Sequence, residues 1–447
     1  MPRDWTKFYL GDIYTERNEP GNENLPLLMV SIHSGVSDGE VDEEQLTKKF
    51  KRIEDKTLYK RAESGDLVFN MMRAWQGAVG TVRTRGMVSP AYIVAKPGDM
   101  VDPLFMNFYM RTDRMIKSIH RQSYGVTDFR LRLYWDSFAA IPCVLPPLPE
   151  QRKIAAILAT QDKVIELYER KIEQLQLLKK NCLRKMFPRH GSDTPEVRFR
   201  GFTGTWERKR LGDLFTEYAE KGHPELPALM TIQGGGTVRR DESDRNLQYD
   251  KHSLSNYKVA NKGDFIVHLR SFEGGLEIVT TPGLISPAYH VFHGKRIDPR
   301  FYYAYFRSVD FIECDLKPHV YGIRDGRSID IEGMKTIMIP HVSRKEQQAI
   351  GNCIESFDRL IALNQRKRDE EKQKKKALMQ LLLTGIVRVG KAASCRLERA
   401  GNEAAGSRFS TRIAISHPPI SHKTGAYSVC FARQTHAAPA FPSVTAN

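Results

Sequence analysis

Two long stretches of the chain repeat apolar residues at intervals of three and four positions, which is the period of one helix face. They run from residue 149 to 187 and from residue 343 to 385. The apolar positions are Ile154, Leu158, Ile165, Tyr168, Ile172, Leu175, Cys182 and Met186 in the first, and Ile350, Ile354, Phe357, Ile361, Leu378 and Leu382 in the second. A helix of about 35 residues spans on the order of 50 Å, more than one small domain covers. Each stretch therefore predicts a long helix that packs against a partner helix.

The segment before each predicted helix has a different pattern. Short apolar runs bounded by Gly, Pro and Asp predict strands, and in the first half these cover residues 67–71, 80–83 and 92–95. The predicted fold class is accordingly α+β, with each α/β unit followed by one long helix.

The two halves also share short motifs in the same order, at an offset of roughly 200 residues, far longer than the period of a solenoid repeat. The matching pairs are Leu10-Gly11-Asp12 and Leu211-Gly212-Asp213, Gly65-Asp66 and Gly263-Asp264, Ser89-Pro90-Ala91-Tyr92 and Ser286-Pro287-Ala288-Tyr289, Asp102-Pro103 and Asp298-Pro299, and Glu150-Gln151 and Glu346-Gln347. An internal duplication follows from the conserved order.

The duplication and the composition together predict the domain boundaries. The first α/β domain covers residues 1–148 and its helix 149–187, and a polar, turn-rich linker covers 188–205. The second domain covers 206–342 and its helix 343–385. Residues 391–447 show no sustained period, are rich in Ala, Ser, Pro and His, and predict a disordered tail outside the repeat.

The charge of the chain narrows the class of partner. Its 447 residues include 69 Lys and Arg against 53 Asp and Glu, for a net charge of +16, and a polyanion is the partner that this favours. The tail holds seven basic and two acidic residues, so most of the positive charge belongs to the duplicated part. No apolar run approaches the roughly 20 residues of a membrane helix, and the polar N-terminus does not resemble a secretory signal, so a cytoplasmic protein without a membrane segment is expected.

The sequence lacks the common motifs of nucleotide-binding enzymes and amino-methyltransferases. We find no phosphate-binding Gly-x-x-x-x-Gly-Lys-Ser/Thr loop, no Gly-x-Gly-x-x-Gly after a strand, and no Asn/Asp-Pro-Pro-aromatic motif. The Gly234–Gly236 run predicts a turn, because no helix start with a Lys follows it. The six cysteines are scattered singly and the histidines do not cluster at metal-ligand spacing, so neither disulfides nor a metal site is expected.

Over about residues 5–388 the sequence resembles the specificity subunit of type I restriction-modification systems. The resemblance rests on the Trp-x4-Leu-Gly-Asp opening of each half, on the Ser-Pro-Ala-Tyr strand, on the Pro-Leu-Pro-Glu-Gln-Arg-Lys-Ile run at 147–154, and on the linker from Pro195 to Trp206. The second helix departs from the pattern, because it begins as Ser343-Arg344-Lys345-Glu346-Gln347-Gln348 without the prolines. The tail after about Lys391 has no counterpart in the family.

The resemblance implies that this chain recognises DNA and that partner subunits carry out the catalysis. Each half would be a target recognition domain, and the two helices would pair as an antiparallel coiled coil. The chain would bind a bipartite target in double-stranded DNA and have no active site of its own. Methyltransferase (M) subunits with S-adenosylmethionine would methylate adenine at N6, and restriction (R) subunits with ATP and Mg²⁺ would translocate and cleave, so this chain would hold no cofactor.

The segments 36–61 and 237–258 differ between the halves, so the two half-sites should differ in sequence. Further candidate DNA contacts combine donors that reach base edges with basic side chains that meet phosphate. They are Arg73, Trp75, Gln76, Tyr124, Thr127, Arg130 and Arg132 in the first half, and Arg270, Ser271, Tyr321, Arg324 and Arg327 in the second. Other interpretations stay open: Trp75 and Phe272 as buried aromatics that close a turn, and 123–132 as a solvated loop. Ser-Pro-Ala-Tyr is assigned to the framework because both halves share it.

Two other functions remain open at this point. The same recognition domains could serve a methyltransferase or nuclease fused into one chain, although the missing catalytic motifs disfavour this. The duplicated domains could instead bind protein as a structural adaptor, with the positive charge incidental. Salt-dependent binding to duplex DNA would separate the adaptor from the other two functions.

Overall fold

The computed structural model describes residues 4–37, 39, 54–127, 130–189, 191–242, 251–268, 270–322, 328–389 and 444–446. The chain divides into two compact units, Met1–Leu167 with Lys367–Thr424, and Tyr168–Arg366 with Gly425–Asn447. Each unit contains one copy of the repeat, part of the first long helix and part of the second. The predicted tail lies outside the described residues except for the strand β24 (Val444–Ala446), which pairs with β11 (Val197–Phe199) in the second unit.

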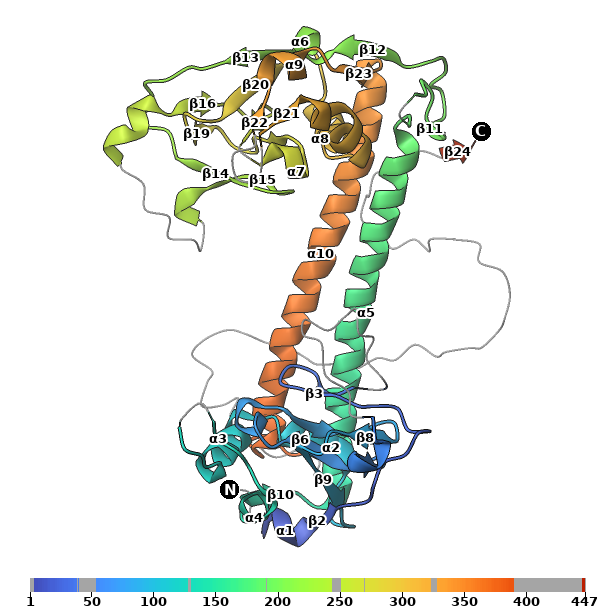
Figure 1. The fold of residues 1–447 in the computed structure, drawn as a ribbon, viewed down its shortest axis with the longest axis vertical. Helices are drawn as coiled ribbons and strands as arrows, with labels where there is room; N and C mark the ends of the chain where they lie inside the picture. Colours follow the sequence, from blue (N-terminus) through green and yellow to red (C-terminus); the bar gives the residue numbers. More distant parts are fainter. Residues whose placement is uncertain are drawn as a thin grey trace, which may run out of the picture. The chain divides into compact units, whose positions relative to one another are not determined.

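The first unit is built on a four-stranded antiparallel sheet in the order β2-β9-β6-β7 (Figure 1). These strands are β2 (Tyr14–Arg17), β9 (Tyr92–Pro97), β6 (Leu67–Asn70) and β7 (Val79–Thr81). Three strand pairs surround it: β1 (Thr6–Tyr9) with β10 (Pro142–Leu145), β3 (Val30–Ser31) with β4 (Gly35–Val36), and β5 (Lys60–Ala62) with β8 (Gly86–Val88). The short helices are α1 (Leu10–Ile13), η2 (Lys56–Leu58), η3 (Ala74–Gln76), α2 (Pro103–Tyr109), α3 (Asp113–Gln122) and α4 (Trp135–Ala139).

The second unit repeats this sheet as β13-β20-β17-β18, from β13 (Phe215–Tyr218), β20 (His290–Gly294), β17 (Phe265–Val267) and β18 (Glu277–Ile278). Its strand pairs are β12 (Glu207–Arg210) with β23 (Met338–His341), β14 (Leu229–Ile232) with β15 (Gly236–Arg239), β16 (Lys258–Ala260) with β19 (Gly283–Ile285), and β21 (Val320–Tyr321) with β22 (Ser328–Ile329). Its short helices are α6 (Leu211–Leu214), η4 (Arg240–Glu242), η5 (Lys251–Asn256), α7 (Ser271–Gly274), α8 (Pro299–Phe306), η6 (Asp310–Leu316), η7 (Lys317–His319) and α9 (Ile331–Lys335). The shared strand order agrees with the duplication read from the sequence.

The repeated Asp-Pro motif begins a helix in each unit. Asp102 caps α2 by accepting the Phe105 amide at 2.8 Å, and Asp298 caps α8 by accepting the Arg300 amide at 2.9 Å. The following proline occupies the first helical turn, where its missing N–H costs no hydrogen bond. The motif therefore fixes the start of the helix that packs against the central sheet in each unit.

The two long helices are α5 (Leu148–Met186) and α10 (Arg344–Leu383), and within each unit their parts pack side by side in opposite directions (Figure 1). In the first unit Gln161 of α5 donates to the Glu371 carbonyl of α10 at 3.2 Å, and Leu158 and Leu382 share one core. In the second unit Lys179 of α5 meets Asp358 of α10 at 2.6 Å. The predicted fold class, α+β with two long paired helices, is confirmed. Among the described helices, none is both long and apolar enough to cross a membrane.

The glutamine of each Glu-Gln motif ties the start of a long helix to its own domain. The Gln151 amide oxygen accepts the Asp102 N–H at 2.9 Å, and its amide nitrogen donates to the Pro146 carbonyl at 2.9 Å. In the second unit Gln347 accepts the Asp298 N–H at 2.8 Å and donates to the Val342 carbonyl at 2.8 Å. Both glutamines are fully buried, so these bonds are protected from water.

The glutamate of each motif is buried and binds an arginine that follows the other long helix. Arg388, just after α10, donates to both Glu150 oxygens at 2.7 Å. Arg198, after α5, donates to both Glu346 oxygens at 2.7 and 2.8 Å. A bidentate guanidinium–carboxylate pair fixes geometry as well as charge. Each unit therefore has the same lock, which joins the start of one helix to the segment that follows the other.

We predict that Arg198→Ala destabilises the second unit by about 3–5 kcal/mol, because it leaves the Glu346 carboxylate buried without a partner. The matched control is Arg189→Ala, from the same linker, whose partner Glu196 is exposed. An exposed pair contributes about 0–1 kcal/mol, so the control should change little. Chemical unfolding of the full chain, followed by tryptophan fluorescence, measures both. Equal unfolding midpoints for the two variants would contradict a stabilising role for the Arg198–Glu346 ion pair.

Candidate nucleic-acid interface

The first candidate segment in unit 1 is a turn built at the end of strand β6. The Asn70 side chain accepts the Met72 amide at 3.0 Å, and the Asn70 carbonyl accepts the Arg73 amide at 3.0 Å. Gly77 closes the turn with a φ of +103°, a conformation that glycine adopts without strain. Arg73 and Gln76 are exposed on this turn.

Trp75 in the same turn is held by the protein. Its indole N–H donates to the Met72 carbonyl at 3.0 Å, and its ring meets the edge of His120 at a centroid distance of 5.7 Å. The side chain is half-buried against the core of unit 1. These contacts favour the interpretation of Trp75 as an aromatic that closes the turn.

The matching turn in unit 2 is one residue longer, because α7 ends at Gly274 and Gly275 has the positive φ of +80°. Arg270 is exposed, as Arg73 is. Its amide donates to His268 Nδ1 at 3.2 Å, and burial lowers the pKa of His268, so the ring is a neutral acceptor at pH 7.

Ser271 differs from the other predicted contacts because it is fully buried. Its hydroxyl oxygen accepts the His268 amide at 2.9 Å, so the side chain shapes the start of α7. The sequence placed Ser271 among the DNA contacts because its neighbour Arg270 matches Arg73. In this structure it belongs to the framework of the turn.

The second candidate segment in unit 1 is a narrow loop closed by Tyr124 and Arg132, whose backbones exchange hydrogen bonds of 3.0 and 2.9 Å. A Cβ on Gly125 would lie 2.2 Å from the Arg130 carbonyl, so only glycine allows the two sides to approach this closely. Tyr124, Thr127, Arg130 and Arg132 are all exposed, and the Tyr124 ring packs on Tyr134 at 5.2 Å. The loop thus presents two arginines on a constrained backbone.

In unit 2 the corresponding loop begins with Tyr321, which is exposed on the strand pair β21–β22. Arg324 and Arg327 lie outside the described residues, as do residues 38, 40–53 and 243–250 of the predicted base-reading segments 36–61 and 237–258. Their contacts remain predictions from the sequence.

The structure brings the two candidate segments of unit 1 together. The loop follows helix α3, whose His120 contacts Trp75, and Leu133 just after the loop donates its amide to the Met71 carbonyl at 2.9 Å. The Arg73 turn and the 123–132 loop are therefore neighbours on one side of unit 1.

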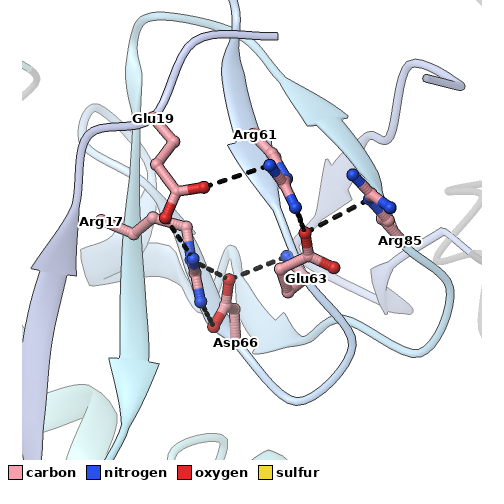
Figure 2. A network of polar contacts seen from close by, with 6 residues as sticks. All are labelled: Arg17, Glu19, Arg61, Glu63, Asp66 and Arg85. Atoms are coloured by element: carbon pink, nitrogen blue, oxygen red, sulfur yellow. Dashed lines mark hydrogen bonds and ion pairs between the residues drawn. The ribbon is translucent and has the colours of Figure 1, made fainter. Parts of the chain in front are cut away.

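The arginines of unit 1 divide into two groups by their ion pairs. Figure 2 shows a network in which the buried Asp66 accepts the Arg17 guanidinium at 2.8 Å, while Glu63 binds Arg61 and Arg85. In contrast, Arg73, Arg130 and Arg132 form no ion pair with another described residue. Their charges are available to an anionic partner.

The buried carboxylate of this network is a feature of both units. Asp66 accepts the Glu63 amide at 2.8 Å and Asp264 accepts the Asn261 amide at 2.7 Å, so each stabilises the turn before a central strand. Burial raises the pKa of Asp66 even though Arg17 acts against it. In unit 2 Tyr218 and His293 take the place of the arginine as partners. These polar clusters are structural.

We compared the chain with known proteins. None of the protein-family models matches it. The type I restriction enzyme MjaVIII specificity subunit of Methanocaldococcus jannaschii is 23% identical over 421 residues, which cover 87% of this chain and 94% of that protein. The putative type I restriction enzyme MjaX specificity subunit of the same organism is 25% identical over 256 residues, which cover 55% of this chain and 59% of that protein.

A solved structure from a study of complex assembly and conformational transition of the type I R-M system has the same fold. Its TM-score is 0.51 at 16% identity, with coverage of 86% of this chain and 98% of the other. The resemblance inferred from the sequence is confirmed by these relatives.

We predict that Arg73→Ala and Arg270→Ala each weaken binding of the chain to its DNA target by about 5- to 100-fold, because each removes a charged donor that forms no ion pair with any residue the structure describes. The matched control is Arg85→Ala, an exposed arginine of unit 1 that is paired with Glu63. Fluorescence anisotropy with a labelled duplex measures all three. A control that weakens binding as strongly as Arg73→Ala would contradict this assignment.

Proposed function

We propose that this chain, a relative of the type I restriction specificity subunits, is the DNA sequence-recognition subunit of a restriction-modification complex. The observation that carries the proposal is the duplicated unit, in which the same turn of both copies exposes an arginine that forms no ion pair with a described residue. Two readers on one chain suit a DNA target with two half-sites.

The target in this proposal is asymmetric. The two turns share their arginine but differ at the following positions, where Trp75 and Gln76 correspond to Phe272 and Glu273. Glutamine pairs best with adenine and glutamate accepts from cytosine, so the two turns suit different bases. Base pairs between the half-sites would not be read.

We assign the chemistry to partner subunits. Methyltransferase subunits would bind S-adenosylmethionine and methylate adenine at N6, and restriction subunits would use ATP and Mg²⁺. The chain itself would choose the site at which they act, which fits the missing catalytic motifs of its sequence. Methylation by this chain alone would instead support the fused enzyme.

The test is co-expression of the full chain with the neighbouring methyltransferase subunit, followed by mapping of methylated adenines across a genome. We expect one asymmetric motif made of two half-sites with a fixed gap. A stable complex that methylates no motif would overturn the proposal and favour the adaptor function.

Salt dependence gives a second, independent measurement. A subunit that neutralises several phosphates should lose affinity for duplex DNA steeply as salt rises, with a linear dependence of log K on log salt concentration. Binding that does not change with salt would contradict a DNA-recognition role.

A further inference from the structure

The hairpin β14–β15 of unit 2 ends in a tip, defined here as Gln233–Gly236, that no sequence motif assigned to DNA. The tip leads directly into the 237–258 segment. Gln233 is exposed, and its side chain makes no hydrogen bond with any residue that the structure describes. An exposed carboxamide without a protein partner offers both a donor and an acceptor to a ligand.

The tip lies against the candidate Arg270 turn. A Cβ placed on Gly274 would come within 2.5 Å of Gln233 Nε2 and 2.8 Å of its Cγ, so the two segments are in contact. The same neighbours meet in unit 1, where a Cβ on Gly77 would lie 3.8 Å from the Ile32 carbonyl. Both units therefore place a hairpin tip beside the arginine turn.

A fully buried carboxylate holds the tip in unit 2. Glu277 accepts the Gly234 amide at 2.6 Å and the Gly236 amide at 3.0 Å. It also accepts the Tyr303 hydroxyl and the Arg307 guanidinium, both at 2.8 Å. Burial, and then the adjacent Glu277, raise the pKa of Tyr303, so its hydroxyl remains a donor.

Unit 1 builds its tip differently. Gly80 occupies the position of Glu277, and a Cβ there would lie 2.9 Å from the Val36 amide, so the hairpin packs directly on the sheet backbone. Arg111, at the position of Arg307, donates to the His33 carbonyl of that tip. In both units the rest of the domain holds the hairpin tip in place beside the arginine turn. The side chains at the tip differ between the units, with Gln233 in unit 2 and Ile32 in unit 1.

We propose that Gln233 is a base-reading residue of the second domain, and that Glu277 and Gly274 are positioning residues that hold it beside Arg270. This inference rests on the proposed function. Bidentate pairing with the N6 and N7 edge of adenine is the contact that a glutamine makes best in the major groove. The exposed Glu273 of the same turn disfavours phosphate and is consistent with a surface that meets base edges.

The test uses the full chain co-expressed with its methyltransferase partner, and reads the motif from mapped methylated adenines. Gln233→Ala should reduce discrimination at one position of one half-site by about 5- to 100-fold, and leave the other half-site unchanged. Gln233→Glu, of nearly the same size, should shift that position towards cytosine, the base whose amino group a carboxylate accepts. A residue with only a structural role would not change the preferred base.

Two further variants sharpen the result. Gly274→Ala adds one methyl group against the Gln233 amide and should relax the same position as Gln233→Ala. Gln348→Ala, an exposed glutamine on α10, is the matched control and should leave the motif intact.

The outcomes for the Gln233 variants and for the wild-type chain separate the inference from the proposed function. If Gln233→Ala unfolds the domain, as a shifted unfolding midpoint would reveal, Gln233→Glu carries the test. An unchanged motif in Gln233→Glu overturns the inference while the proposed function stands. A wild-type chain that directs no motif overturns the proposed function and this inference with it.

Discussion

The buried glutamate at the start of each long helix is the interaction on which the architecture depends. A carboxylate in an apolar setting requires a partner of opposite charge, and in both units the partner comes from the segment that follows the other helix. The neighbouring glutamine anchors the same helix start to the loop before α2 or α8. Two adjacent residues thus join a recognition domain, the start of one helix and the end of the other.

The sequence was sufficient to predict the long helices and the duplication. A three-and-four period over nearly 40 residues has few alternatives, and α5 and α10 begin and end within two residues of the predicted limits. The roles of Glu150 and Glu346 could not be predicted, although the motif was noticed, because Arg198 and Arg388 do not stand at matching positions of the repeat. The pairing depends on tertiary structure alone.

In the candidate interface, too, the sequence predicts only part of the arrangement of the side chains. Arg73 and Arg270 lie exposed on turns as their spacing suggested, whereas Ser271 is buried although it follows Arg270 directly. Ala74, the residue that matches Ser271 in unit 1, is buried as well, so the position after the arginine faces the core in both units. The residue type alone does not reveal this. Gln233 carried no motif, and only its contact with Gly274 brings it to attention. The availability of an arginine likewise depends on neighbours distant in sequence, as the comparison of Arg73 with Arg85 illustrates.

The lock between Glu150 and Arg388 has a consequence for the order in which the protein is made. The first unit needs residues 367–389, so about 200 residues must be synthesised after Leu167 before that unit has all its parts. At a synthesis rate of about 5–20 residues per second, this delay is on the order of 10–40 s. The second unit has its domain and most of its helical parts earlier. The domain that leaves the ribosome first must therefore wait until the second domain has been synthesised before the apolar seam of its helix is covered.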